Sequence, residues 1–193
     1  MDMIEDKEHL TKEGFLKILS IKSVFPKGLS DKIKKIYPDI KLYDKPMYKC
    51  SKKSINPYWI AGFVQGDGTF GLNITKQNRM TLGYTSQPQF RITQHYRDII
   101  VLERIIQTLK CGILIKPYIS RNEYNISVAN IRDLSEIIIP FFKKYSLCGA
   151  KLLDFNDFCK GISIIKNKGH LNVEGLNQLK KLAYQMNIYR KWK

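Results

Sequence analysis

The sequence predicts an α+β fold in which helices cover one face of a four-stranded antiparallel sheet. Two observations lead to this prediction. Residues 69–76 and 87–95 alternate apolar and polar residues, with the period of two that is typical of half-buried strands, and residues 112–119 and 123–130 are interpreted as further strands. The segments between and after them repeat apolar residues with a period near 3.6, which is typical of helices. Strands in consecutive pairs, separated and followed by helices, favour this class of fold.

The first helix of the domain is predicted over residues 58–65, within the stretch NPYWIAGFVQGDG. Pro57 fits the first turn of a helix and cannot continue a strand. The residues after it are apolar on nearly every side, so the helix should be buried. Gly68 is expected to take the left-handed conformation that ends a helix.

The remaining elements follow along the chain in the order β-β-α-β-β-α-α-α. The strands are expected at 69–76, 87–95, 112–119 and 123–130. The helices are expected at 97–110, at 131–145 with a break near Pro140, at 149–165, and from 170 onward. The domain therefore ends in helices that extend beyond its α-β-β-α-β-β-α core.

A repeated motif joins the two ends of the chain. Residues 7–18 (KEHLTKEGFLKI) and 168–179 (KGHLNVEGLNQL) both read K-x-H-L-x-x-E-G, followed by apolar residues at helical spacing. Thr11 and Asn172 stand where a helix N-cap is expected. The repeat predicts that residues 1–30 are the tail helix of an upstream repeat. Residues 31–54 are then a basic linker with one short helix near 31–36, and residues 55–193 are one complete domain.

The charge of the chain favours a polyanionic partner. The sequence holds 33 Lys and Arg against 17 Asp and Glu, a net charge of +16. Such an excess attracts nucleic acid most simply, because a positive field strengthens phosphate binding. A membrane surface would also attract it. However, the chain has neither a basic amphipathic anchor nor an apolar run near the roughly 20 residues of a spanning helix. No membrane partner is expected.

The cysteines and the N-terminus indicate a reducing compartment. The four cysteines are scattered, without a C-x-x-C motif, so a structural zinc site is not expected. The first ten residues, MDMIEDKEHL, are acidic and lack the apolar region of a secretory signal.

The face of the sheet turned away from the core is predicted to bind nucleic acid. Its side chains are hydrogen-bonding or cationic with few acids, whereas a solvated face would mix both signs of charge. Such side chains read base edges and phosphates in a major groove. The predicted contact residues are Asn73, Thr75, Gln77, Arg79, Gln89, Arg91, Lys116, Tyr118, Arg121, Asn125 and Ser127.

The Gly-Asp-Gly stretch suggests a metal site at a helix seam. Gly62 and Gly66, with Ala61 beside them, form a stripe of small residues that would let a second helix approach closely. Asp67 ends this stripe, so two packed copies would bring two carboxylates together. Such a pair is costly unless a cation neutralises it, and oxygen ligands suit Mg²⁺. The alternative is an ordinary turn.

A family resemblance adds to this interpretation. IAGFVQGDG at residues 60–68 resembles the LAGLIDADG motif of the homing endonucleases. FRITQH, LKCGILI, IIIPFFKKY and GAKLLDFNDF are also similar, in order and spacing. The resemblance covers residues 55–190, and residues 1–30 resemble the end of a preceding repeat of the two-motif, fungal mitochondrial type. It implies a saddle-shaped sheet on double-stranded DNA, a mitochondrial location, and cleavage with two or more Mg²⁺ per pair of sites.

The resemblance also implies roles for individual residues. Asp67 would bind the metal, with help from the carbonyl of Gly66. Gln94 would lie near the metal-bound waters. Lys151 would be the basic residue near the scissile phosphate, and Lys144 competes for that role.

Two functions remain open at this point, because the chain has one such motif and the family needs two acids at the seam. In the first, the chain is half of a DNA endonuclease, completed by homodimerisation or by a separate chain. In the second, it is a non-catalytic remnant that binds structured RNA, since members of this family also act as RNA maturases.

Overall fold

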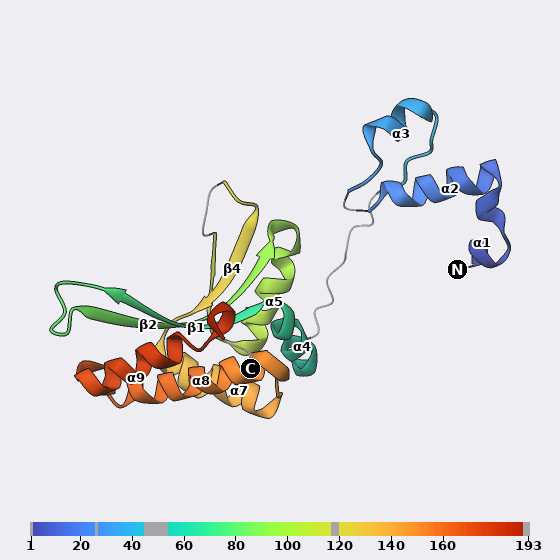
Figure 1. Cartoon of the computed structure of the whole chain (residues 1–193). Helices are drawn as coiled ribbons and strands as arrows, with labels where there is room; N and C mark the ends of the chain where they lie inside the picture. Colours follow the sequence, from blue (N-terminus) through green and yellow to red (C-terminus); the bar gives the residue numbers. More distant parts are fainter. Residues whose placement is uncertain (1, 26, 45–53, 117–119, 191–193) are drawn as a thin grey trace. The chain divides into compact units, whose positions relative to one another are not determined.

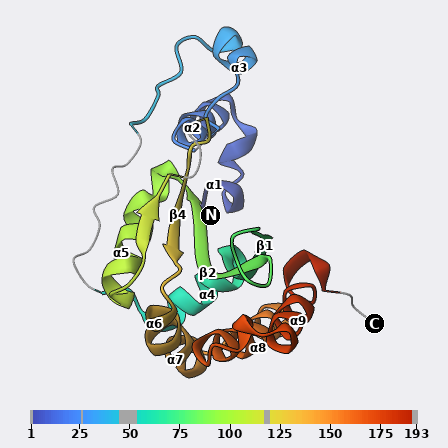
Figure 2. The same cartoon turned by 90° about the vertical axis from the view of Figure 1, so that its left-hand side faces the viewer.

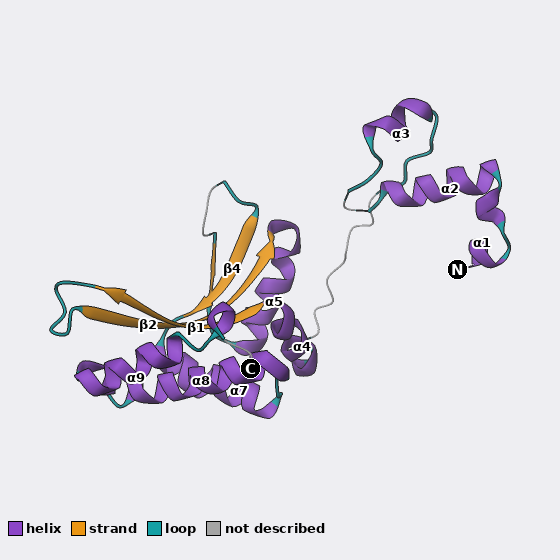
Figure 3. Ribbon diagram, viewed as in Figure 1, coloured by secondary structure: helices purple, strands orange, loops and turns teal. Residues whose placement is uncertain are grey.

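The computed structural model describes residues 2–25, 27–44, 54–116 and 120–190. The chain divides into two compact units, residues 1–51 and residues 52–193. Figures 1 and 3 show the helices and strands of both units.

The first unit is helical. It contains α1 (Asp2–Glu5), a 3₁₀ turn (Glu8–Leu10), α2 (Lys12–Ser23) and α3 (Asp31–Ile36). The short helix predicted at 31–36 is confirmed, and its N-cap Ser30 accepts a hydrogen bond from the Ile33 amide. Part of the expected linker packs on α2: the ring of Tyr37 meets that of Phe15 at 5.7 Å, and the Tyr43 amide donates to Ser23 Oγ.

The second unit is the predicted α+β domain. Its elements are α4 (Pro57–Asp67), β1 (Gly68–Lys76), β2 (Tyr84–His95), α5 (Ile99–Leu109), β3 (Ile113–Ile115), β4 (Glu123–Val128), α6 (Ile131–Asp133), α7 (Ile139–Lys144), α8 (Gly149–Lys166) and α9 (Val173–Ala183). The sheet is antiparallel, with the strand order β1-β2-β4-β3. Residues 117–119 of the expected third strand lie outside the described residues.

The core lies between one face of the sheet and the helices. Phe70, Phe90 and Ile92 of the sheet are fully buried together with Phe158 of α8 and Leu102 of α5. Alternation along β1 and β2 dictates this arrangement, because every second side chain points to the same face. Figure 2 shows α8 and α9 following one another along the sheet.

The helix predicted to break near Pro140 continues through it. Proline has no amide hydrogen and its ring crowds the preceding turn, so an ordinary α-helix is disrupted there. The chain instead forms a π-helical turn (Leu134–Ile138) between α6 and α7. This wider turn accommodates Pro140 while the helical direction is kept.

The end of the second unit is fixed by an ion cluster that the sequence analysis did not predict. Arg190 Nη2 lies 2.7 Å from Asp154 Oδ1 and 2.8 Å from Asp157 Oδ2, and all three side chains are largely buried. Burial alone would raise the pKa of the Asp157 carboxyl, but hydrogen bonds from Arg190 and Lys160 lower it below its ordinary value.

Candidate active site

Asp67 is the last residue of α4, and β1 begins at the next residue. The Asn56 side chain caps the helix by accepting from the Tyr58 amide, and Pro57 occupies the first turn. Ile60 and Val64 are fully buried, so they anchor α4 to the core. The Asp67 carboxylate is exposed at the junction of helix and strand.

Gly68 does not take the left-handed conformation that the sequence analysis predicted. Its φ is −84° and its ψ is 150°, which is an extended conformation open to any residue. A glycine is needed for another reason. A Cβ at this position would lie 2.4 Å from Val64 Cγ1 and 2.8 Å from the Val64 carbonyl oxygen. The chain therefore turns from α4 into β1 too tightly for any side chain.

The three residues expected to carry the chemistry lie together. Gln94, near the end of β2, donates from Nε2 to Asp67 Oδ2 over 2.7 Å. The antiparallel register brings it there, because Gly68 pairs with Ile92. Lys151, in the first turn of α8, donates from Nζ to the Gly68 carbonyl. A carboxylate, an amide and an ammonium group thus meet where β1 begins.

Lys144 occupies a different place. It is the last residue of α7, and its ammonium group lies 5.5 Å from the centroid of the Tyr145 ring. Of the two lysines considered, Lys151 is therefore the one whose ammonium group is bound beside Asp67.

Gln65 supports this arrangement, and the sequence analysis assigned it no role. Its Nε2 donates to the Cys148 carbonyl over 2.9 Å, and its Oε1 accepts from the Cys148 amide over 3.0 Å. Cys148 precedes α8 and offers no side-chain cap to that helix. Gln65 therefore fixes the start of α8, where Lys151 lies. The signal for this role in the sequence is that Gln65 is a polar residue on a helix that is otherwise nearly apolar.

The three residues of the expected seam do not all lie on the same side of α4. Gly62 and Gly66 are exposed, and a Cβ on either would meet no atom within 4 Å. Ala61 differs, because it is buried in the core of its own domain. Each residue turns a helix by about 100°, so Ala61 shares the inward side with Ile60 rather than the side of Gly62. The uncovered face instead includes Trp59, whose ring stacks on Phe63 at 4.9 Å.

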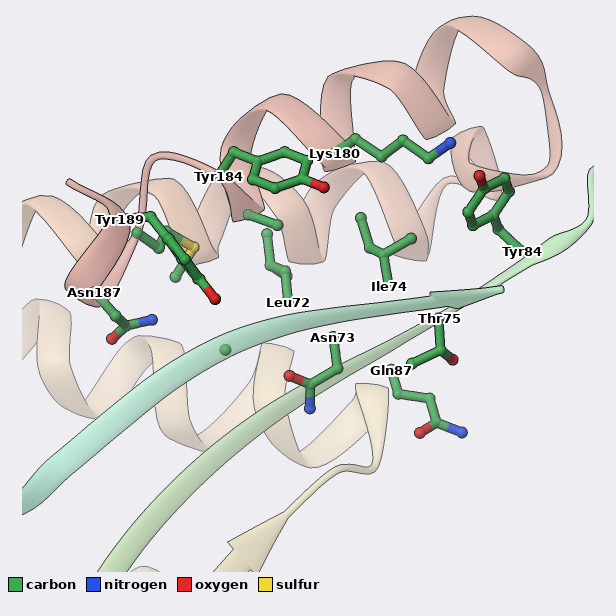
Figure 4. A pocket seen from close by; sticks show the side chains of 13 residues that line it. Leu72, Asn73, Ile74, Thr75, Tyr84, Gln87, Lys180, Tyr184, Asn187 and Tyr189 are labelled. Carbon is green, nitrogen blue, oxygen red and sulfur yellow. The ribbon is translucent and has the colours of Figure 1, made fainter. Parts of the chain in front are cut away.

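The polar face of the sheet is continuous across β1, β2 and β4. Figure 4 shows Leu72 and Ile74 pointing toward the helix that carries Lys180, and Asn73 and Gln87 pointing to the opposite side. The register aligns the polar positions in the pairs Thr69/Arg91, Gly71/Gln89, Asn73/Gln87, Thr75/Thr85, Arg91/Ser127 and Thr93/Asn125.

Asn125 and Ser127 lie deep within this face. Both are buried, and Ser127 Oγ accepts from Gln89 Nε2 over 2.6 Å. Within the described residues, Asn125 Oδ1 has no hydrogen-bond partner. A buried acceptor without a partner is costly, so a donor from a bound molecule would be favoured here.

Other predicted contact residues lie outside the strands. Gln77 and Arg79 belong to the connection between β1 and β2, where both are exposed. Arg121 precedes β4, and its guanidinium lies 4.0 Å from the Glu123 carboxylate. Tyr118 is outside the described residues.

Lys116 lies outside the strands, although it was expected within one. β3 ends at Ile115, and Lys116 follows it. Ile113 and Ile115 pair with Ser127 and Asn125, so these two exposed isoleucines occupy the polar face. Lys116 itself is exposed.

The donor set at Asp67 fits half of a divalent-metal site. Carboxylate and carbonyl oxygens are the ligands of Mg²⁺ and Ca²⁺, and the exposed Asp67 and the Gly66 carbonyl provide both kinds. Among the residues that the structure describes, no three His, Cys, Asp or Glu side chains gather in a metal-binding group. Across the same residues, no helix is long and apolar enough to cross a membrane.

Comparisons with known proteins agree with this fold. A family model for the LAGLIDADG endonuclease matches residues 60–162. The "Probable intron-encoded endonuclease 3" of Neurospora crassa is 35% identical over 177 residues, which cover 92% of this chain and 33% of that protein. The chain belongs to the LAGLIDADG endonuclease family.

Solved structures of the family share the fold. The I-LtrWI LAGLIDADG homing endonuclease bound to target DNA is 37% identical, with a TM-score of 0.90 over 98% of this chain and 63% of that chain. I-SmaMI bound to uncleaved DNA target in the presence of calcium ions is 38% identical, with a TM-score of 0.89 over 96% of this chain and 63% of that chain. These 193 residues thus span less than two thirds of the solved relatives.

Proposed function

We propose that this chain supplies one half of a site-specific homing endonuclease that hydrolyses double-stranded DNA with Mg²⁺. The observation that carries this proposal is the convergence of Asp67, Gln94 and Lys151 beside the polar sheet face. The register supports this placement, because Thr69 and Arg91 of that face lie next to the start of β1.

Each group has a role suited to phosphodiester hydrolysis. Asp67, with the Gly66 carbonyl, would hold Mg²⁺, which supplies a water of lowered pKa and neutralises developing charge when it is bound. Gln94 orients the Asp67 carboxylate and lies where it can order nearby water. Lys151 places a positive charge beside the scissile phosphate, and its bond to the Gly68 carbonyl fixes its position before the reaction.

A second half would complete the site. One carboxylate provides too few charged ligands for tight Mg²⁺ binding, and the uncovered Gly62 and Gly66 leave room for a second helix to bring another acid. The second half would come from homodimerisation or from a separate chain. We further propose that residues 1–30 are the tail of an upstream repeat, and that the protein works in the mitochondrial matrix.

The competing function is a non-catalytic component that binds structured RNA, as an intron maturase or ribonucleoprotein subunit does. The lone carboxylate at Asp67 favours it, because a chain that no longer cuts needs no second acid. The net charge of +16 serves either ligand.

Replacing Asp67 by Asn tests the proposed function. With Mg²⁺ and DNA that carries the intron-insertion sequence, cleavage should fall by about 10²–10³-fold or more, because the metal loses its charged ligand. DNA affinity should stay within a few-fold, since this acid repels phosphate. A strand-cleavage assay and a parallel binding titration would measure both effects.

The two functions predict different results for the wild-type chain. Equal cleavage by wild type and by the Asp67→Asn variant would refute the role of Asp67. A wild-type chain that leaves the DNA intact, yet binds structured RNA far more tightly than duplex DNA, would replace the endonuclease by the RNA-binding function.

A further inference from the structure

The motif repeated at the two ends of the chain folds into the same local structure in both places. Its matched pairs are Lys7/Lys168, Thr11/Asn172 and Gly14/Gly175. Both lysines are left-handed, with φ of 57° and 58°. Both cap side chains accept from the amide of the matched glycine, over 3.0 Å and 2.8 Å. The predicted N-caps are confirmed.

The matched glycines are needed for the same reason. A Cβ on Gly14 would lie 1.9 Å from the Glu8 carbonyl oxygen, and one on Gly175 would lie 2.2 Å from that of Gly169. In each copy the 3₁₀ turn packs against the start of the following helix. The two segments are therefore copies of one structural motif, in which the 3₁₀ turn and the helix after it are arranged in the same way.

In the second copy, α9 buries an apolar face. Leu176, Leu179 and Met186 are buried, and Leu182 packs against the same core. Beyond its own 3₁₀ turn, α9 packs mainly against α8 and β1 of its own domain. This copy shows which surface the motif covers when its neighbours are present.

In the first copy, α2 and the two residues that follow it carry four apolar residues at the matching positions. These are Phe15, Ile18, Ile21 and Phe25. Phe15, Ile21 and Phe25 are 40%, 41% and 57% exposed, and Ile18 is half-buried. Ile18, Ile21 and Phe25 also line a shallow groove whose walls are almost entirely apolar.

The two copies differ in exposure on this face, but not at every pair of matched positions. Leu10 and its counterpart Leu171 are 74% and 65% exposed, so a position that is open in the complete copy is open in both. On the other side of α2, Leu19 is buried, as is Leu29. The side of α2 that carries Leu19 is thus packed within the first unit, whereas the side that matches the buried face of α9 is open.

We propose that Phe15, Ile18, Ile21 and Phe25 dock onto the long helix and first strand of a second LAGLIDADG repeat outside these 193 residues. The α2 helix would lie on that repeat as α9 lies on α8 and β1. The equivalent surface of this chain is already covered by α9, so neither this copy nor a second copy offers it. The solved relatives have the necessary extra length, since this chain covers 63% of each.

This inference rests on the proposed function, because the docked repeat is also the one that would bring the second carboxylate. Docking would tether the second repeat through α2, independently of the seam at Gly62 and Gly66. The chain would therefore complete the core of its partner as well as the shared active site.

The test is co-expression of the full chain with the part of I-LtrWI that has no counterpart here, produced as a separate polypeptide. We expect a one-to-one complex that is visible by sedimentation. Changing Ile18 and Phe25 together to Ser should weaken that complex at least about 100-fold, because both anchors of the apolar face are lost. Leu10→Ser is the matched control and should bind as wild type does.

Two results would overturn the proposal. One is a complex that the Ile18→Ser, Phe25→Ser variant forms as tightly as wild type does. The other is an I-LtrWI polypeptide that does not bind the co-expressed full chain, or that stays insoluble in its presence. The Asp67→Asn chain should form the complex normally, because Asp67 is not on α2. A complex that assembles but does not cut would therefore count against the proposed function and not against docking.

Discussion

The helices α4 and α2 each leave one face uncovered, and the two faces differ in kind. On α4 the exposed face centres on Gly62 and Gly66, where an added Cβ would meet nothing within 4 Å. On α2 it consists of large apolar side chains, with Phe25 the most exposed. Small residues favour close approach of two backbones, whereas large apolar residues favour burial against a broad surface.

The difference separates two tasks in assembly. A glycine seam contributes little buried apolar area, but it sets the separation of two helices and hence of the acids at their ends. The α2 face would contribute hydrophobic area with little demand on catalytic geometry. We infer that α2 provides binding energy and α4 provides alignment. Changes on one face should therefore alter different measurements from changes on the other.

The largest expected effect is on the stability of the second unit, which contains α9, the covered counterpart of α2. Arg190→Met would leave Asp154 and Asp157 largely buried without their main cation. We expect a loss of about 3–5 kcal/mol in the free energy of unfolding of the second unit, because an uncompensated buried charge remains. Urea unfolding followed by circular dichroism would measure it.

Arg132→Met is the matched control for that change. Arg132 pairs with Glu136 at 3.0 Å on an exposed helix face, and such pairs contribute at most about 1 kcal/mol. Equal effects of the two substitutions would show that the Arg190 cluster does not hold the segment after α9 against α8. The packing of α9 would then be a weaker model for the packing of α2.

The next effect is at the seam. Gly62→Leu should block the approach of a second helix and weaken assembly by about 1–3 kcal/mol, with cleavage lost in parallel. The isolated domain should stay folded, because nothing lies near this position. Gly62→Ala should even stabilise the domain by up to about 1 kcal/mol while it still impairs assembly. Sedimentation with and without target DNA, beside thermal unfolding, would separate the effects.

Asn177→Leu provides the control for an added leucine on an exposed helix, since Asn177 lies on the outer side of α9. It should leave both assembly and cleavage unchanged. Normal association and cleavage by Gly62→Leu would mean that the α4 face is not a seam.

The alternating strands and the buried helix faces could be predicted from sequence periodicity, but the sides of α4 could not. An apolar helix gives no amphipathic signal, so Ala61 was placed with Gly62 although it faces the core. Lys116 was expected inside a strand over residues 112–119, whereas β3 ends at Ile115. In both cases the periodic pattern lacks a signal: α4 has no polar side, and the sequence does not mark where the third strand ends.

The candidate site shows a second limit. The Gly-Asp-Gly stretch already suggested Asp67, but Gln94 and Lys151 were found through family resemblance, since periodicity alone does not bring residues from α4, β2 and α8 together. Gln65 and Cys148 are 83 positions apart, and Arg190 is 36 positions from Asp154. Such pairs depend on how α8 packs, which no local pattern in one sequence contains.

A change on the sheet should leave both helix faces unaffected. Arg91 lies between Thr69 and Ser127 in the register, so it is central to the polar face. Arg91→Ala should reduce discrimination at one base pair by about 1–3 kcal/mol, while assembly is unchanged. Binding to a library of single-base variants would measure this. An equal loss for every sequence would make Arg91 a phosphate contact, and Lys166→Ala should change no preference.

The smallest expected effect links α4 to the lysine of the site. Gln65→Ala removes both hydrogen bonds to the Cys148 backbone, and their exposure limits the loss of stability to about 1–2 kcal/mol. The start of α8 should become less ordered, so Lys151 would be held less firmly beside Gly68. We expect kcat to fall by about tenfold with DNA affinity unchanged, because Lys151 acts on the transition state.

Gln65→Glu distinguishes this positioning role from a general loss of stability. The carboxylate can still accept from the Cys148 amide, but it has no hydrogen to donate to the Cys148 carbonyl. It should therefore give a kcat between those of wild type and Gln65→Ala, measured in single-turnover cleavage with saturating chain. If both variants lose stability while kcat stays at the wild-type value, then α8 positions Lys151 without help from Gln65. The face of α4 that carries Gly62 would in that case affect cleavage through assembly alone.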